Sequence, residues 1–438
     1  MQNSHSAARL RVLVCAFACS PGGSGGLAGG ETVLGWNIVR QLARFHDLVV
    51  LSHPWNRDGI ERSQKALGPN VQFCYFDTPR AVRFLRRWQG AFQVYAYLWQ
   101  IKAYFVARRL HRERPFDVFH HVTYANDWMA SYIGALLPVP YIRGPGGGAQ
   151  RTPGAFLKEY KFRDRLWERV RAVMRIVLRS DPFFLLSQHR ARAILVCNRE
   201  SMEALPMRWK NKAYHFPVNG VTSEDLSDAP PRVKNDGTFR VFSAGKLLHW
   251  KGFGLVIRSF ARFAQGHPEA ELAIAGDGPE FPRLNTLVHE LGVGEKVRFE
   301  RWLPRQEILS RMRASDVFLY GSLREGGGAI VVEAMAAGLP VVCLDLSGPA
   351  IHLADGCGIK IKAETPQQVV ADMATALERL CADPELRRRM GIAAHKRAGK
   401  VYHWDRQGDR LLRIYQTILN GLPAAISAEE ANAIAEKV

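Results

Sequence analysis

The chain has 438 residues, of which 47% are hydrophobic and 23% are charged, and its formal net charge is +19. This composition excludes global disorder and predicts a globular protein of two or three domains. The sequence contains no run of 18 uncharged apolar residues, and its N-terminus lacks the pattern of a secretory signal, so we expect a cytoplasmic protein without a membrane-spanning helix.

The positive charge is concentrated in the N-terminal half. Residues 80–114 contain nine Lys or Arg and one acidic residue, and residues 150–180 contain nine Lys or Arg and three acidic residues. Such a field attracts nucleic acid, an anionic membrane or a phosphate-rich substrate. No nucleic-acid recognition motif accompanies the charge, so we expect no nucleic-acid partner. The seven cysteines include no C-x-x-C pair, which is typical of buried thiols in a reducing compartment.

In the N-terminal half, short apolar runs alternate with helical patterns, which predicts βαβ units and a parallel sheet. A strand over residues 10–18 leads through a glycine-rich loop, which contains Gly29 and Gly30, into a helix over 32–45. Further strands are expected at 48–52, 116–121 and 194–197. The loop lacks the G-x-G-x-x-G spacing, so a lip over a ligand is favoured over a dinucleotide site.

Residues 82–110 carry aromatic side chains near helical spacing, flanked by arginines. Two interpretations remain open: a face for an anionic membrane surface, or a core helix with solvated arginines. The aromatic residues are Phe84, Trp88, Phe92, Tyr95, Trp99 and Phe105.

His120 and His121 end the strand expected at 116–121, at the edge where α/β sheets place their ligands. Adjacent residues of a strand point to opposite faces, so at most one of the two faces a ligand. A catalytic role for one of them and a structural role for both fit this pattern.

The C-terminal half predicts a second α/β domain. Strands are expected at 239–244, 271–275, 297–300, 316–320 and 340–344, with helices at 304–313 and 325–337. A stretch rich in Pro, Asp, Ser and Asn separates the halves. We therefore divide the chain into an N-terminal domain (1–218), a linker (219–238), a C-terminal domain (239–405), a helix (406–420) and a tail (421–438).

Lys246 and Lys251 follow the strand at 239–244, on a loop that leads into a helix. Lysines in this place can neutralise a diphosphate leaving group, although two solvated lysines would give the same pattern. The turn around Asp277, between Gly276 and Gly278, is interpreted as structural, because glycine supplies the turn.

The strongest local feature is the segment from Glu325 to Glu333, in which three glycines open a helix. Backbone amides of a glycine-rich turn and a helix N-terminus form an anion site. On one helix the two carboxylates would be about 12 Å apart, which is wider than the pair of a glycoside hydrolase. They therefore fit two ends of one ligand, or else a pair of solvated glutamates.

No D-x-D, H-E-x-x-H or Walker A motif occurs, and the sequence predicts no metal site.

Together these motifs resemble the large family 4 of retaining GT-B glycosyltransferases, in a bacterial branch active in exopolysaccharide or lipopolysaccharide assembly. The resemblance implies two Rossmann-like, doubly wound α/β domains that face each other across a cleft. The motifs that carry it are Gly245-Lys246, Lys251-Gly252, Gly276-Asp277-Gly278-Pro279, Glu325-x7-Glu333, Gly30-Glu31-Thr32, His120-His121-Val122-Thr123-Tyr124 and Arg143-Gly144-Pro145.

The resemblance also implies roles for single residues. Lys246 and Lys251 would bind the donor diphosphate, and the amides of Gly327, Gly328, Ala329 and Ile330 its distal phosphate. Glu325 would contact hydroxyls of the transferred sugar, and Glu333 would hold the ribose. Gly29 and Gly30 would close over the phosphates, and His120 or His121 would touch the sugar. Two departures stand out: Lys246 replaces the usual arginine, and Gly327 the usual aromatic residue.

The implied activity is transfer of a hexose from a UDP- or GDP-sugar, without metal or other cofactor and with retention of configuration. The implied acceptor is a glycan or a polyprenyl-diphosphate-linked sugar, reached from the inner face of the cytoplasmic membrane by peripheral binding. Three alternatives remain: a catalytically silent sugar-nucleotide-binding partner, a sugar-nucleotide epimerase of the same fold, and a polyanion-binding protein.

Overall fold

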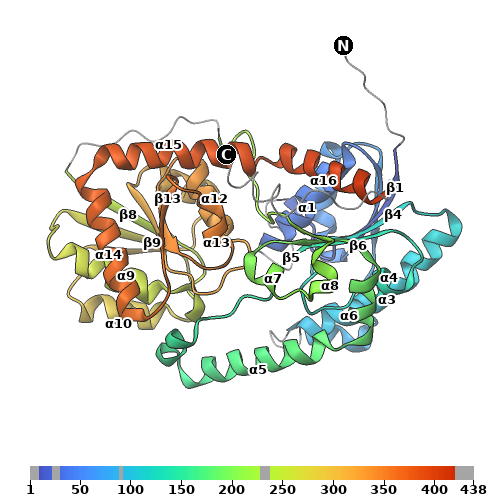
Figure 1. Cartoon of the computed structure of the whole chain (residues 1–438), viewed down its shortest axis with the longest axis horizontal. Helices are drawn as coiled ribbons and strands as arrows, with labels where there is room; N and C mark the ends of the chain where they lie inside the picture. Colours follow the sequence, from blue (N-terminus) through green and yellow to red (C-terminus); the bar gives the residue numbers. More distant parts are fainter. Residues whose placement is uncertain (1–8, 22–29, 88–91, 227–236, 420–438) are drawn as a thin grey trace, which may run out of the picture.

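The computed structural model describes residues 9–21, 30–87, 92–226 and 237–419, to which the account below is confined. Two α/β domains lie side by side along the long axis of the molecule (Figure 1). Each is built on a parallel sheet, in the order β3-β2-β1-β4-β5-β6-β7 for the first and β10-β9-β8-β11-β12-β13 for the second. The prediction of two Rossmann-like domains with a GT-B arrangement is therefore confirmed.

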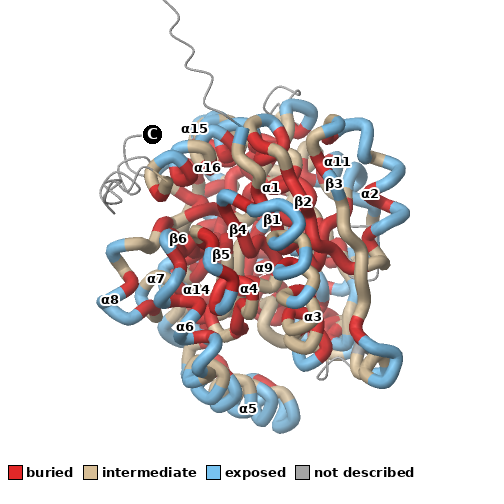
Figure 2. The backbone as a smooth tube through the Cα atoms, turned by 90° about the vertical axis from the view of Figure 1, so that its right-hand side faces the viewer, coloured by how far each residue is buried: buried red, intermediate tan, exposed pale blue. Residues whose placement is uncertain are grey.

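The strands of the N-terminal sheet are buried on both faces, as their apolar sequences require. In β1, Val12 and Val14 pack into the cluster on one face, whereas Leu13 and Cys15 pack into the cluster on the other. Figure 2 shows β1, β2 and β4 with mostly buried residues in the interior of this domain. The strands are β1 (Arg11–Cys15), β2 (Asp47–Ser52), β3 (Val71–Tyr75), β4 (Val118–His121), β5 (Tyr141–Gly146), β6 (Ala191–Val196) and β7 (Ala213–His215).

Helices cover both faces of this sheet, because parallel strands are joined by crossover connections. The α-helices are α1 (Gly30–Ala43), α2 (Arg57–Ser63), α3 (Phe92–Glu113), α4 (Tyr132–Leu136), α5 (Phe162–Arg179), α6 (Pro182–Arg190), α7 (Arg199–Glu203) and α8 (Met207–Lys210). Four 3-10 turns, η2 (Pro54–Asn56), η3 (Gln64–Ala66), η4 (Arg80–Arg87) and η5 (Gly154–Glu159), lie in the connections.

The C-terminal sheet follows the same rules: Val241 faces the cluster under α9 and α14, and Phe242 faces the cluster under α11, α12 and α15. Its strands are β8 (Phe239–Ala244), β9 (Ala270–Ala275), β10 (Val297–Arg301), β11 (Val317–Tyr320), β12 (Val341–Leu344) and β13 (Gly358–Ile361). Its helices are η6 (His249–Lys251), α9 (Phe253–Ala264), α10 (Phe281–Glu290), α11 (Arg305–Arg313), α12 (Ala329–Ala336), α13 (Ser347–His352), α14 (Pro366–Ala382) and α15 (Pro384–Val401).

The order of strands reverses at two places, between β1 and β4 and between β8 and β11. In doubly wound sheets, ligands bind beyond the carboxyl ends of the strands at such a switch point. The loops after β1, β4, β8 and β11 are therefore the places to look for a site.

The last described helix, α16 (Trp404–Leu419), returns to the N-terminal domain (Figure 1). Trp404, Leu411 and Tyr415 are buried in the same apolar cluster as Val12 of β1. The chain thus passes from the N-terminal to the C-terminal domain between β7 and β8, and it returns before α16.

A second exchange runs in the opposite direction. The segment before α5 belongs to the N-terminal half of the sequence, but Phe156 and Tyr160 are buried in the core cluster of the C-terminal domain. Arg258 of α9 donates a hydrogen bond to Glu159 at 3.3 Å. We call residues 154–179, which comprise η5 and α5, the arm.

The segment at 82–110 is a 3-10 turn followed by α3, and the interpretation of its aromatic residues as a membrane face is wrong for two of them. Tyr95 and Trp99 are fully buried in the core, where Trp99 stacks on Phe76. Phe84 and Phe105 are exposed, and Trp88 lies outside the described residues. Tyr95 and Trp99 are buried, and do not face a membrane, because α3 covers one face of the sheet.

Replacing Leu411 by alanine tests whether α16 completes the N-terminal core. Leu411 is fully buried, so the substitution should lower the free energy of unfolding by about 2–5 kcal/mol. Urea denaturation followed by circular dichroism measures this change. The exposed neighbour Gln416, changed to alanine, should have almost no effect; equal effects of the two variants would contradict the packing of α16.

Candidate active site

The loops at the switch point of the C-terminal sheet bring Lys251, Tyr320 and Glu325 together. The Lys251 ammonium contacts Glu325 Oε2 and donates a hydrogen bond to Tyr320 Oη at 3.2 Å. The Tyr320 hydroxyl in turn donates to Glu325 Oε2 at 2.6 Å. Both charged side chains are largely covered, with 17% and 18% of their surface exposed. The structure therefore joins two of the predicted site residues into one polar cluster.

The surroundings of Glu325 keep its carboxylate ionised. Burial disfavours the charged form, but the nearby Lys251 charge and the hydrogen bonds from Lys251, Tyr320 and Ser322 outweigh burial and lower the pKa of Glu325. Burial also disfavours the charged form of Lys251, yet its two partners raise its pKa above the ordinary value. The cluster thus holds one negative and one positive charge at the sheet edge.

The glycines after Glu325 form a turn that packs against both domains. A Cβ atom on Gly327 would lie 2.2 Å from Val218 Cγ2, and the Gly326 carbonyl accepts a hydrogen bond from Asn198 Nδ2 at 3.1 Å. Gly328 has a φ of 67°, a left-handed conformation that favours glycine. This crowding explains why Gly327 stands where the resembling family has an aromatic side chain.

The helix α12 begins at Ala329, four residues later than predicted, because three successive glycines do not extend a helix. Only Glu333 of the two glutamates is therefore helical. The first amides of α12, those of Ala329 and Ile330, have no acceptor within the helix and carry its positive dipole end. With the glycine turn they form an edge of amide donors beside the Lys251–Glu325 cluster.

Glu333 is engaged by a residue that the sequence analysis did not single out. Arg305 donates from Nε to Glu333 at 2.7 Å and from Nη1 to Asp225 at 2.8 Å. Burial raises the pKa of Glu333, and Arg305 opposes that shift only in part. Arg305 is half-exposed and lies 28 positions from Glu333, so no local motif could have paired them.

Lys246 is exposed, and its side-chain ammonium has no hydrogen-bond or ion-pair partner within the described ranges. Its loop is tied to the next one, because the Leu247 amide donates to the Asp277 carbonyl at 2.9 Å. A Cβ atom on Gly276 would lie 1.9 Å from the Gly245 carbonyl oxygen. The glycines around Asp277 thus permit close approach of two loops, which is the structural role expected of them.

The N-terminal domain contributes the opposite wall. Glu200 of α7 accepts hydrogen bonds from the amide and the hydroxyl of Ser347, at 2.8 Å and 3.0 Å. Gly30 is the first residue of α1, and Gly29 lies outside the described residues. Glu31, beside Gly30, accepts a hydrogen bond from the Tyr124 amide at 3.3 Å.

The prediction that His120 or His121 faces a ligand is not met. Both rings are fully buried, on opposite sides of β4, because α16 and α3 cover the two faces of the sheet. His120 Nε2 donates to the Gly144 carbonyl at 2.6 Å, and Nδ1 accepts from Tyr415 Oη at 2.8 Å. His121 Nε2 accepts from the side-chain amide of Gln100 at 3.1 Å. Both histidines are core residues in this structure.

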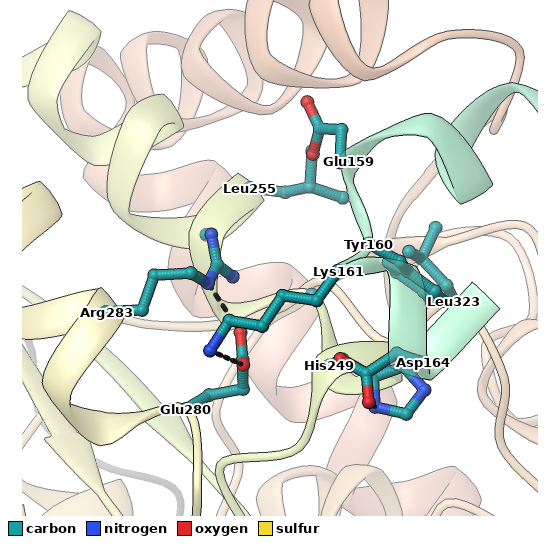
Figure 3. A pocket seen from close by; sticks show the side chains of 11 residues that line it. Glu159, Tyr160, Lys161, Asp164, His249, Leu255, Glu280, Arg283 and Leu323 are labelled. Carbon is teal, nitrogen blue, oxygen red and sulfur yellow. Dashed lines mark hydrogen bonds and ion pairs between the residues drawn. The ribbon is translucent and has the colours of Figure 1, made fainter. Parts of the chain in front are cut away.

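A polar pocket lies between the arm and the first turns of α9 and α10 (Figure 3). Glu280 accepts a hydrogen bond from Arg283 at 2.6 Å and lies 3.9 Å from the Lys161 ammonium. Asp164 pairs with His249 at 3.5 Å. The Lys161–Glu280 and Asp164–His249 contacts both join the arm to the C-terminal domain, so the pocket lies where the arm meets that domain.

Within the described part of the chain, no group of three or more His, Cys, Asp or Glu side chains is arranged to hold a metal ion. The polar atoms gathered at the two sheet edges are instead amides, lysines and glutamates.

The buried histidines should make the fold sensitive to acid. Burial lowers the pKa of His120 to about 4 and that of His121 to about 3, so the unfolded chain takes up these protons first. The free energy of unfolding should therefore fall as the pH drops from about 6.5 towards 4, by up to about 1.4 kcal/mol per pH unit for each histidine. Urea denaturation at several pH values should show a smaller slope for His120→Gln, whereas the exposed His289→Gln should keep the slope of the parent chain. An unchanged slope in His120→Gln would contradict the neutral, buried state of this ring.

Comparison with known proteins identifies the domain that carries this cluster. Residues 227–397 match the family model described as glycosyl transferases group 1. A D-inositol 3-phosphate glycosyltransferase of Corynebacterium jeikeium is 31% identical over 182 residues, which is 40% of this chain and 42% of that protein. The lipopolysaccharide core biosynthesis glycosyltransferase LpsE of Rhizobium meliloti is 32% identical over 217 residues, which is 48% of this chain and 60% of that protein. The chain thus spans about half the length of the curated relatives it matches.

Among solved structures, a sucrose-phosphate synthase from Thermosynechococcus elongatus superimposes with a TM-score of 0.63 at 17% identity, over 94% of this chain and all of that one. At this identity the likeness shows the fold alone, and it extends over both domains of this chain. The match to the group 1 glycosyl transferases is therefore carried by residues 227–397, which hold the Lys251–Glu325 cluster.

Proposed function

We propose that the chain is a retaining, metal-independent glycosyltransferase that moves a hexose from a UDP- or GDP-sugar to a glycan or polyprenyl-diphosphate-linked acceptor. The observation that carries the proposal is the cluster of Lys251, Tyr320 and Glu325 beside the glycine turn and the first amides of α12. It offers cation, amide and carboxylate groups at one edge of the sheet, from the loops after β8 and β11, and these are the groups that a sugar diphosphate requires.

The diphosphate would bind at the amides of Gly327–Ile330, with Lys251 and the unpaired Lys246 beside it. When the bond between the anomeric carbon and the diphosphate oxygen breaks, negative charge accumulates on the diphosphate. Cations and amides already in place stabilise that charge without reorganisation. Lys246 is exposed, so it can swing to the phosphates without breaking an existing ion pair among the described residues.

The carboxylates would bind hydroxyl groups at the two ends of the donor. Glu325 is ionised and therefore only accepts hydrogen bonds, which fits the hydroxyls of the transferred sugar. Glu333 would accept from the ribose hydroxyls, with Arg305 and Asp225 holding its side chain in place. This assignment keeps the diphosphate between the two glutamates.

The acceptor would lie against the N-terminal domain, which faces the glycine turn through Asn198 and Glu200. The excess of basic residues in this half suits a lipid-linked diphosphate at an anionic membrane surface. Of the helices that the structure describes, none combines the length and hydropathy needed to cross a bilayer. We therefore propose peripheral binding to the inner face of the membrane, in cell-surface polysaccharide synthesis, the process class named for the Rhizobium relative.

Lys251→Met should weaken binding of the donor nucleotide about 10- to 100-fold, because a hydrogen bond to a charged group contributes about 1.5–3 kcal/mol. Thermal shift against UDP, GDP, ADP and their hexose conjugates measures the affinity by mass action. The same variant should reduce transfer of labelled hexose to a bacterial lipid extract, with the hexose conjugate of whichever nucleotide binds as the donor. Nuclear magnetic resonance of the product should show the donor's anomeric configuration.

Lys360→Met is the matched control, since Lys360 is an exposed lysine on β13 of the same domain. It should bind nucleotide and transfer sugar like the parent chain. Failure of every nucleotide to raise the melting temperature of the parent chain would overturn the proposal, and so would equal affinities of the two variants. Conversion of the donor without any acceptor would favour the epimerase.

A further inference from the structure

The helix α5 is amphipathic, but its polarity is reversed relative to a helix packed on a soluble protein. Asp164, Glu168, Arg171, Arg175 and Arg179 recur at spacings of three and four residues, so they share one face. This charged face is turned towards the protein. The helix lies at the rim of the molecule and carries many exposed residues (Figure 2).

Ion pairs and hydrogen bonds from both domains hold the charged face. Glu168 pairs with Arg324 of the C-terminal domain at 3.2 Å. Arg175 and Arg179 lie 3.4 Å and 3.3 Å from Asp127 of the N-terminal domain. The orientation of α5 is therefore fixed by charged partners rather than by apolar packing.

The opposite face of α5 exposes large apolar side chains to solvent. The exposed fractions are 73% for Phe162, 51% for Trp167, 59% for Val173, 63% for Ile176 and 58% for Val177. The following helix α6 adds Phe183, Leu185 and Leu186, each more than one-third exposed. Scattered apolar residues are normal on a surface, but a contiguous set of this size marks a binding surface.

Basic residues lie beside and within this apolar surface. Arg163, Arg165 and Arg169 are exposed and are not used by the charged face. At 100° per residue, Arg165 falls at one edge of the apolar stripe, and Arg163 and Arg169 fall within it. Large apolar side chains between cations are the composition of a helix that lies in the interface of an anionic bilayer.

We propose that the exposed face of α5, with the first turn of α6, docks the protein in the plane of an anionic phospholipid membrane. The inference rests on the proposed function, for which it supplies the membrane contact that was one of the two interpretations of residues 82–110. A second copy of the chain fits the surface less well, because pairing α5 with itself would bring the same three arginines together. Anionic headgroups would neutralise those arginines, while the acyl region would take the apolar side chains.

The docked arm would also bring the active site near the lipid. Phe156 and Tyr160 anchor the arm in the core of the C-terminal domain, and Arg171 donates to the Gln150 carbonyl at 3.2 Å at the other wall. A helix fixed to both domains places the membrane at a constant position relative to the glycine turn. A lipid-linked acceptor can then meet the donor without leaving the bilayer.

Flotation of the full chain with vesicles tests the proposal. Vesicles of phosphatidylcholine mixed with phosphatidylglycerol should carry the parent chain, and vesicles of phosphatidylcholine alone should carry much less. Val173→Asp/Ile176→Asp should reduce binding about tenfold or more, since it places charges in the acyl region. Arg163→Gln/Arg165→Gln/Arg169→Gln should remove the preference for anionic vesicles and the salt dependence of binding. Each arginine should account for a roughly tenfold or smaller change in affinity for anionic vesicles.

Met207→Asp is the matched control, since Met207 is 78% exposed on α8 of the same domain. It should float like the parent chain. All changed residues are exposed. An unchanged melting temperature in each variant excludes a loss of folding, and an unchanged nucleotide-induced shift excludes a loss of donor binding. Absence of flotation by the parent chain, or equal flotation of all variants, would overturn the proposal. So would a dimer in sedimentation velocity that Val173→Asp/Ile176→Asp dissociates without any vesicle binding, which would assign the surface to self-association.

Discussion

The close packing of the glycine turn at residues 326–328 is the constraint on which the rest of the site depends. A Cβ atom on Gly348 would lie 2.6 Å from the carbonyl oxygens of Gly326 and Gly327, and one on Gly327 would clash with Val218. Because side chains are absent here, the turn can touch the loop after β6 of one domain and α13 of the other at once. Glu325, the amides of α12 and the wall at Asn198 are thereby held at one place.

Two exchanges of chain between the domains support that arrangement. The helix α16 leaves the C-terminal domain and completes the N-terminal core through Leu411 and Tyr415. The arm leaves the N-terminal half and inserts Phe156 and Tyr160 into the other core. The first exchange also holds His120 in place, because its ring bonds to both Tyr415 of α16 and the Gly144 carbonyl of β5. Binding residues on one domain thus depend on packing in both.

The sequence predicts the fold well where one local rule suffices. The strand at 239–244 has the predicted bounds, since a β-branched and aromatic run ends there at a glycine turn. Lys251 and Glu325 were predicted as two separate features, and only the fold shows that they contact each other and share Tyr320 as a partner. Their meeting depends on β8 and β11 being neighbours across a switch point, which local patterns do not encode.

Two patterns could not be resolved from the sequence, for a common physical reason. For the aromatic residues between arginines at 82–110, a membrane face and a core helix both remained open, and Tyr95 and Trp99 are in the core. The helix α5 has the same composition but turns its charged face to the protein, because Asp127 and Arg324 form ion pairs with that face. A periodic pattern shows that a helix has two faces, whereas the neighbours decide which face is outside. The histidines were misplaced for the same reason, since the covering helices α3 and α16 are distant in sequence.

The central claim is that the glycine turn and α12 hold the donor diphosphate. A crystal structure of the chain with UDP or GDP, whichever binds, tests it most directly. The account predicts the diphosphate at the amides of Gly327–Ile330, with Lys251 within hydrogen-bond distance and the ribose beside Glu333. A nucleotide bound elsewhere, with these amides empty and Lys251 still paired only to Glu325 and Tyr320, would contradict it.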